Sequence, residues 1–466
     1  MTRAPGARVT YDRPLVGAVT ATLDRTDVTR TPAVPASRRD VLAPVAIALT
    51  LVPLVVLAVH MLRSDVFLTA DLATTEMLTR DLGHRSPSLG PFSRDGWFHP
   101  GPALFYVLAP SYRLFGSDGS ALAVGAVVVN AVSVVTMGVV ARRRGGTGLM
   151  LATLLGCAVL MHAVGPTFLA TPWNVYVTVL PYGALVFLTW AVVAGERWAL
   201  PAATFATSFL MQTHVGYVAL ALPLLVGAGA WTLGVAIVDR RRRRGERGAE
   251  EPADAVAAGP DEDGAAPADD GPEPDDRSEP DDPLVPVAGR ATTGGLVGPV
   301  VVSVAIAVVM WLPPVVQQVT HEKGNVDRIV EWFREGDEEA RTLLEGWRVV
   351  ADQYAWPPEW IAGQAPLVLN NEPAAVYLGV VPILLVPVLA AAGYLWWRRG
   401  RPARALAATW FAASAVAVVA TSRTVGPLYA YRLHWAWALG MVGGVLVGWA
   451  AWTLATGRTG ARARQV

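Results

Sequence analysis

The fold of this chain is decided by the segment after its first apolar run, residues 69–116: TADLATTEMLTRDLGHRSPSLGPFSRDGWFHPGPALFYVLAPSYRLFG. The preceding run, residues 41–62, is long and apolar enough to form a helix that crosses a membrane. A chain that only had to re-enter the bilayer would need a short polar turn at this point. Residues 69–116 instead hold acids, histidines, arginines and a proline-punctuated apolar stretch. This composition indicates a loop with a function of its own outside the membrane.

The composition of the whole chain is that of a membrane protein. Hydrophobic residues make up 53% of it, which is above the range of soluble globular proteins. The net charge is zero, but acids gather in residues 246–282 while arginines flank the apolar runs. Cys157, the only cysteine, lies within an apolar run, so an intramolecular disulfide and a cysteine metal site are excluded.

Runs of about twenty apolar residues can cross the hydrocarbon core as helices, because a helix satisfies its own backbone hydrogen bonds. We predict an all-α integral membrane protein of about ten transmembrane helices, whose first outer loop carries juxtamembrane helices. The ten predicted spans are 41–62, 118–141, 147–165, 174–194, 198–213, 215–238, 295–319, 374–395, 404–421 and 435–456.

Arginines close to the ends of these spans predict the sidedness, since such clusters stay in the cytoplasm. With ten spans every cluster falls on one side, which predicts a plasma-membrane protein with both termini in the cytoplasm. Residues 102–115 would reverse this order if they formed a span, but they are short and contain Pro110 and Arg113. We therefore expect a juxtamembrane helix that lies in the outer interface. The first outer loop is then 63–117.

The remaining parts follow from this topology. Residues 241–293 are acidic, rich in Pro, Ala and Gly and lack aromatic residues, so they cannot bury enough surface to fold. In the late outer loop, apolar residues at helical spacing predict a helix over 340–354. The predicted parts are a disordered cytoplasmic tail 1–40, a membrane core 41–240, a disordered cytoplasmic linker 241–293, C-terminal membrane helices 294–456 with the outer loop 320–373, and a cytoplasmic tail 457–466.

The first outer loop opens with a predicted short amphipathic helix over 71–82. Asp71 stands at its start, just beyond the end of the first span. As a structural residue, Asp71 would be the N-cap of this helix. Glu76 and Arg80 are four residues apart, so an ion pair along the helix is their ordinary explanation.

A resemblance to a known family gives these residues another meaning. An acid that opens the first outer loop, followed by a helix introduced by a His-Pro-Pro type motif, is typical of class C glycosyltransferases (GT-C). Asp71 matches the acid and His99-Pro100-Gly101-Pro102 matches the motif. The chain thus resembles the polyprenyl-phosphate-sugar-dependent members related to protein O-mannosyltransferases and aminoarabinose transferases. Gly101 replaces the usual second proline, and Leu72 follows Asp71 where an Asp-Glu pair would suit a metal, so a divalent metal is possible but not indicated.

The resemblance covers roughly residues 41–240 and implies an inverting transfer at the outer face of the plasma membrane. The donor would be a polyprenyl-phosphate-linked monosaccharide, and the acceptor an envelope glycan, lipid or protein. Such a transfer needs a base for the acceptor hydroxyl. The resemblance implies Asp71 as this base, with Glu76 or Asp81 orienting the acceptor.

The donor leaves as its lipid phosphate, which requires cationic hydrogen-bond donors. Arginine binds phosphate oxygens in a bidentate manner, which lysine does not. Arg423 and Arg432 lie between the last two predicted spans, on the predicted side of Asp71, and either would hold the phosphate. His99 would shape the loop or bind near the phosphate. The alternative is that both arginines only face the aqueous surface.

Two other outer segments carry polar groups next to aromatic residues. Trp173 and Asn174 precede one predicted span, and His214 lies in a tight predicted turn. These side chains are candidates for contacts with the sugar. As structural residues, Trp173 would belong to the interfacial aromatic belt and the histidine would simply prefer the interface.

Other classes of protein fit the sequence less well. A secondary transporter usually carries ionisable groups within its spans, whereas the interiors of the predicted spans lack Asp and Glu. A metal sensor is not indicated, because the histidines form no close pair in sequence. No nucleic-acid-binding motif is present. A polyprenyl-lipid flippase, or an inactive glycolipid-binding protein, stays open as the alternative.

Overall fold

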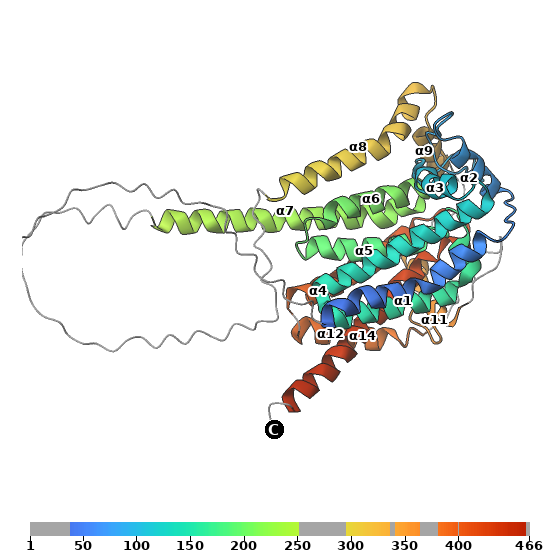
Figure 1. Ribbon diagram of the computed structural model, residues 1–466. Coiled ribbons are helices and arrows are strands. Elements are labelled where there is room, and N and C mark those ends of the chain that lie inside the picture. Colours follow the sequence, from blue (N-terminus) through green and yellow to red (C-terminus); the bar gives the residue numbers. More distant parts are fainter. Residues whose placement is uncertain (1–37, 251–294, 336–340, 364–380, 399, 463–466) are drawn as a thin grey trace, which may run out of the picture. The chain divides into compact units, whose positions relative to one another are not determined.

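The computed structural model of the protein describes residues 38–250, 295–335, 341–363, 381–398 and 400–462 (Figure 1). Every regular element in these ranges is a helix, which confirms the predicted all-α class. The described residues from Ala43 onward cluster into one compact unit. The predicted N-terminal tail and most of the predicted acidic linker lie outside the described residues.

Six described helices are long and apolar enough to cross a membrane: α1, α4, α7, α8, α13 and α14. This is the architecture of a multi-pass helical membrane protein. The helices are α1 Arg38–Met61, α2 Asp71–Arg80, α3 Ala103–Leu114, α4 Gly119–Ala170, α5 Val179–Val193, α6 Ala199–Thr213, α7 Gly216–Glu250, α8 Val297–Thr320, α9 Asn325–Glu335, α10 Leu343–Asp352, α11 Glu359–Ala362, α12 Leu385–Arg398, α13 Arg401–Ser422 and α14 Trp435–Arg462.

Helix α4 contains two of the predicted spans and folds back on itself. Gly146 interrupts it with φ 76° and ψ −166°, a conformation that residues with a side chain rarely adopt. Across the resulting hairpin, the Asn130 side chain donates a hydrogen bond to the Leu169 carbonyl at 3.0 Å. Arg144 lies just before the corner, where its Nε is 3.1 Å from Glu196 Oε1.

Several helix ends differ from the prediction. Helix α5 begins at Val179 rather than at residue 174, because residues 174–178 form turns. Helix α12 begins at Leu385, shortly after Pro382, and the first part of the predicted eighth span lies outside the described residues. Helix α7 runs through Glu250 into the predicted linker, since Arg, Glu and Ala are good helix formers.

The two predicted helices of the first outer loop are present as α2 and α3. The second one, α3, packs against α4 and α6. Leu104, Phe105 and Leu108 of α3 are fully buried. Gly125 of α4 allows this close approach, since a Cβ at that position would lie 2.8 Å from Leu108.

The late loop is anchored on the membrane helices by α10. A Cβ at Gly346 would lie 2.2 Å from the Val418 carbonyl oxygen. Because glycine has no side chain, the backbone of α10 can come into close contact with the backbone of α13 at this point. The predicted helix is confirmed as α10, in which Gly346, Val349 and Val350 are buried, whereas Leu343 and Trp347 are exposed. The close contact at Gly346 turns the buried face toward α13.

The loops that connect the helices form two groups, one at each end of the packed helices. At one end, Trp173 before α5 contacts Asp71 of α2. At the other end, Trp190 near the end of α5 donates a hydrogen bond to the Pro402 carbonyl at the start of α13. Glu196, which follows α5 at this second end, pairs with Arg144.

The buried hydroxyl of Tyr354, which follows α10 and anchors the late loop, gives a stability prediction. The Trp410 indole donates to the Tyr354 hydroxyl at 2.9 Å, and this hydroxyl donates to the Leu439 carbonyl at 3.2 Å, both within the core. We expect Tyr354→Phe to destabilise the protein by about 1–3 kcal/mol, because the buried indole N–H loses its acceptor. The measurement is thermal unfolding in detergent. Tyr106→Phe, at an exposed position of α3, is the matched control, and equal melting of the two variants would refute the anchor.

Candidate functional site

Asp71 is the first residue of α2 and is exposed. The N-cap of α2 is Ala70, with φ 49°, so the interpretation of Asp71 as an N-cap is wrong. Its carboxylate instead accepts a hydrogen bond from the Trp173 indole, with 3.2 Å between Oδ2 and Nε1. Trp173 follows α4, so this contact joins the first loop to the loop between α4 and α5. The structure therefore places Trp173 against the predicted base.

Trp173 belongs to an aromatic wall that we define by four residues, Trp173, Tyr176, Tyr429 and Tyr431. The Trp173 ring centroid lies 5.0 Å from that of Tyr176 and 5.0 Å from that of Tyr431. Tyr429 and Tyr431 stack with nearly parallel rings, 5.4 Å apart. The wall thus extends from the loop between α4 and α5 to the loop between α13 and α14. Aromatic faces with a few polar groups are typical of binding sites for small organic groups.

Arg94 of the first loop binds the two tyrosines of the aromatic wall that lie between α13 and α14. Its Nη2 donates to the Tyr431 hydroxyl at 2.9 Å, and its Nη1 lies 3.4 Å from the Tyr429 hydroxyl. The guanidinium also lies 4.9 Å above the centre of the Tyr429 ring, a cation–π contact. The first and last loops are therefore joined at this point as well.

Two histidines, His99 of the first loop and His214 after α6, meet with their ring centroids 4.6 Å apart. His99 Nδ1 accepts from the Val215 amide at 3.2 Å, and His214 Nδ1 accepts from the Gly216 amide at 3.1 Å. Burial, followed by the charge of Arg432, lowers the pKa of His99 to about 3. Burial, then His99 and Arg432, lowers the pKa of His214 well below its usual value. Each neutral ring therefore carries its proton on Nε2 and can donate it.

The residues that follow His99 pack closely against the turn between α6 and α7. The Gly101 amide donates to the Gln212 carbonyl at 3.2 Å. A Cβ at Gly101 would lie 2.4 Å from Gln212 Oε1. A proline here would lack the N–H donor and would clash, which explains the glycine in this motif. Asn174 is tied to the same turn, since its side chain donates to the Thr213 carbonyl at 3.3 Å; it supports the loop.

The two candidate arginines differ in their surroundings. Arg432 is partly buried, and its charge contributes to the lowered pKa values of His99 and His214. Among the described residues, no carboxylate forms an ion pair with Arg432. Arg423 is exposed at the end of α13, and no contact between described residues joins its side chain to the histidines or the aromatic wall. Of the two candidates, Arg432 is therefore the one whose charge reaches the histidines.

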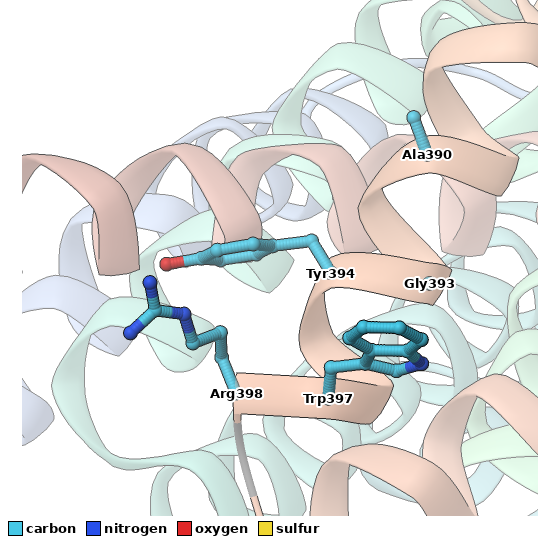
Figure 2. A pocket seen from close by; sticks show the side chains of 5 residues that line it. All are labelled: Ala390, Gly393, Tyr394, Trp397 and Arg398. Atoms are coloured by element: carbon cyan, nitrogen blue, oxygen red, sulfur yellow. The ribbon is translucent and has the colours of Figure 1, made fainter.

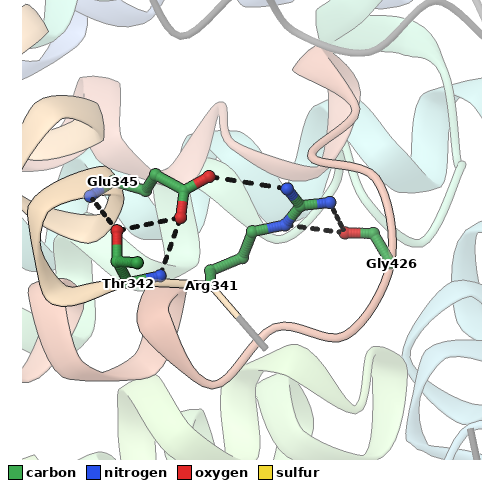
Figure 3. Close-up of polar contacts among 4 residues, drawn as sticks. All are labelled: Arg341, Thr342, Glu345 and Gly426. Carbon is green, nitrogen blue, oxygen red and sulfur yellow. Dashed lines mark hydrogen bonds and ion pairs between the residues drawn. The ribbon is translucent and has the colours of Figure 1, made fainter. Parts of the chain in front are cut away.

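The loop between α13 and α14, which also carries Arg432, is held at Gly426 by Arg341, just before α10 (Figure 3). Arg341 donates to the Gly426 carbonyl through both Nε, at 3.1 Å, and Nη2, at 2.7 Å. Glu345 lies 3.5 Å from Arg341 and closes a capping box with Thr342. Hydrogen bonds from Thr342 and the charge of Arg341 lower the pKa of Glu345, so the arrangement persists at neutral pH.

The other two predicted acids have separate partners. Glu76 accepts a hydrogen bond from the Tyr112 hydroxyl of α3 at 3.2 Å, and the pKa of Tyr112 is raised by burial and by this charge. Asp81 lies 3.7 Å from Arg80, so the expected ion pair between Glu76 and Arg80 is replaced by these contacts. In the described part of the chain, neither carboxylate contacts the aromatic wall. Asp71 is the predicted acid that does.

A hollow lies on a different helix, α12. It has a volume of about 420 Å³ and is lined by residues of α12 (Figure 2). It shares no residue with the site around Asp71. Within the described ranges, no group of three or more His, Cys, Asp or Glu side chains is placed to hold a metal ion.

Sequence reasoning missed four residues of the site, namely Arg94, Tyr176, Tyr429 and Tyr431. The sequence signal for the last two was the aromatic Tyr-Ala-Tyr-Arg run at residues 429–432, in which Ala430–Arg432 form a short 3-10 helix. No sequence pattern identifies Arg94 or Tyr176, because each belongs to the site only through its contacts in the folded structure.

Comparison with known proteins gives no relative for this chain: no family model, no curated protein and no solved structure matches it.

The buried histidines give a prediction for pH. Burial lowers the pKa of His434, which precedes α14, to about 4. An unfolded histidine titrates near 6.5, so between these values the unfolded state binds more protons and stability falls as the pH drops. We expect His434→Gln to reduce the slope of unfolding free energy against pH by about 1.4 kcal/mol per pH unit in this window. Denaturant titrations at about pH 6 and about pH 5 measure it. An unchanged slope would contradict a neutral His434.

Proposed function

We propose that this chain is a class C membrane glycosyltransferase that moves a monosaccharide from a polyprenyl-phosphate donor to an envelope glycan, lipid or protein acceptor. The observation that carries the proposal is the meeting of three groups at one end of the helices. These are the Asp71 carboxylate on Trp173, the aromatic wall, and Arg432, whose charge helps to lower the pKa of two buried histidines. A base, a surface for a sugar and donors for a phosphate are the parts that this reaction needs.

Asp71 has the role of the general base. One carboxylate oxygen is held by the Trp173 indole, which leaves the other oxygen for the acceptor hydroxyl. The carboxylate takes the hydroxyl proton as the acceptor oxygen attacks the anomeric carbon. The bond between this carbon and the phosphate oxygen breaks on the opposite face, so the configuration inverts and the bonding electrons leave with the polyprenyl phosphate.

The leaving phosphate is assigned to Arg432, His99 and His214. One guanidinium supplies the charge and the bidentate geometry. The two neutral imidazoles each offer an Nε2–H donor, because backbone amides occupy both Nδ1 atoms. Donors that are fixed before the reaction stabilise developing negative charge without reorganisation. Glu76 and Asp81 keep the weaker role of orienting the acceptor from α2.

The proposed topology has ten spans, with both termini in the cytoplasm of a plasma-membrane protein. Its support is the arginine pattern together with the hairpin in α4, which supplies two spans from one of the six long helices. The shorter apolar helices α5, α6 and α12 would be the remaining spans. The site around Asp71 would then face outward.

A polyprenyl-lipid flippase is the alternative function, together with an inactive glycolipid-binding protein. The donors around Arg432 would suit the phosphate of a transported lipid equally well. The contact between Asp71 and Trp173 favours the transferase, because a lipid carrier has no use for an oriented carboxylate at the sugar-binding surface.

The decisive variant is Asp71→Asn, which keeps the shape of the side chain and removes the base. We expect release of polyprenyl phosphate to fall at least a hundredfold, because general-base catalysis contributes on the order of 10²–10⁴ in rate. The assay uses nanodiscs with a panel of polyprenyl-phosphate pentoses and hexoses plus an acceptor extract, with detection by mass spectrometry.

Asp65→Asn is the matched control, since Asp65 is an exposed acid of the same loop. It should release lipid phosphate at the wild-type rate. If the wild type binds a donor but releases no lipid phosphate, the transferase proposal fails. Lipid translocation that survives Asp71→Asn would identify a flippase.

A second variant, Trp173→Phe, tests the orientation of the base. Phenylalanine keeps an aromatic face but cannot donate to Asp71. A hydrogen bond to a charged group contributes about 1.5–3 kcal/mol, so we expect kcat to fall roughly tenfold to a hundredfold while KM for the donor changes little. Steady-state kinetics measure both. A rise in KM with an unchanged kcat would show instead that Trp173 only binds the sugar. Trp231→Phe, on the exposed side of α7, is the control.

A further inference from the structure

Helix α12 presents two different faces. Val388, Ala391, Ala392 and Leu395 are buried, at the spacing of one helical face. This face packs against α13 and α14. The other face is open and contains the hollow of about 420 Å³.

The lining of this hollow changes from apolar to polar along the helix. Ala390 and Gly393 form its apolar part, and Tyr394, Trp397 and Arg398 form its other part. Figure 2 shows the side chains of Tyr394 and Arg398 extending in the same direction from α12, which brings a hydroxyl and a guanidinium to one end. The Trp397 side chain is 89% exposed. An apolar notch that ends in aromatic and cationic groups matches a lipid, whose chain is apolar and whose phosphate is charged.

The charge at this end of α12 is positive and uncompensated. Residues 398–404 contain four arginines, and residues 381–422 contain no Asp or Glu. In the part of the chain that the structure describes, no carboxylate pairs with Arg398. A cation in this place attracts anionic headgroups, and tryptophan favours the same depth of the membrane. The predicted sidedness puts this end on the cytoplasmic side, where the leaflet is negative.

We propose that the hollow on α12 binds an anionic diacyl phospholipid, independently of the site around Asp71. Its phosphate lies between the Arg398 guanidinium and the Tyr394 hydroxyl. One acyl chain lies over Ala390 and Gly393, where the missing side chains leave room, and Trp397 covers the glycerol region.

Gly393→Leu is the sharpest test. A Cβ at Gly393 would meet no atom within 4 Å, so leucine fills the hollow without disturbing the packing of the helix. Leucine also has a higher helix propensity than glycine, so the variant should fold. Gly227→Leu on α7 is the matched control, because a Cβ there also meets nothing within 4 Å. The full chain in detergent is titrated with phosphatidylglycerol or phosphatidylcholine, and bound lipid is counted by native mass spectrometry.

We expect one saturable phosphatidylglycerol on the wild type and on Gly227→Leu, and a loss of at least fivefold in its affinity on Gly393→Leu. Arg398→Gln should lose about fivefold, the value of one cation near an anionic lipid. Arg240→Gln, an exposed arginine of α7, should bind as the wild type does. Three results would overturn the proposal. The first is that Gly393→Leu binds phosphatidylglycerol as tightly as the wild type, and the second is that the wild type binds phosphatidylcholine as tightly as phosphatidylglycerol. The third is that an equal amount of polyprenyl phosphate displaces phosphatidylglycerol.

Discussion

The hydrocarbon core of a membrane offers no hydrogen-bond partner to a peptide group, and this constraint organises the described structure. Only helices satisfy their backbone groups there, so the crossing segments are helical and their interiors carry little besides apolar side chains. All side chains with chemistry must then gather where helices end. At one end are Asp71, His99 and Arg432, and at the other are arginines that pair with Glu196 or stay exposed.

The loops at the candidate site are held by contacts between side chain and backbone. Arg341 binds the Gly426 carbonyl, the Asn325 side chain bonds both the N–H and the carbonyl of Phe98, and Asn174 binds the Thr213 carbonyl. Such bonds fix the path of a loop without depending on its other side chains. A site built from several loops in this way is organised before any ligand arrives.

The electrostatics of the two ends differ in kind. Near Asp71, two imidazoles are kept neutral by burial, so the positive charge comes from guanidinium groups while the imidazoles provide directed donors. Along α12, the cations are exposed and stand beside an apolar notch. The first arrangement suits a reacting phosphate that must be positioned. The second suits a lipid headgroup that only has to be retained, because exposed cations act through charge rather than geometry.

The sequence alone determined the helical class, most of the long helices, and α2 and α3, because apolar runs and helical spacing act over one or two turns. It also indicated Asp71, His99 and Arg432 as candidates. The tertiary structure decided what these residues meet. Trp173 is 102 positions from Asp71 and Tyr431 is 337 positions from Arg94, and no local pattern links such pairs. Loops carry no periodicity, so their contacts depend on where the packed helices bring their ends. For the same reason, the helical spacing of α10 indicated a helix but not the face that the close contact at Gly346 turns inward.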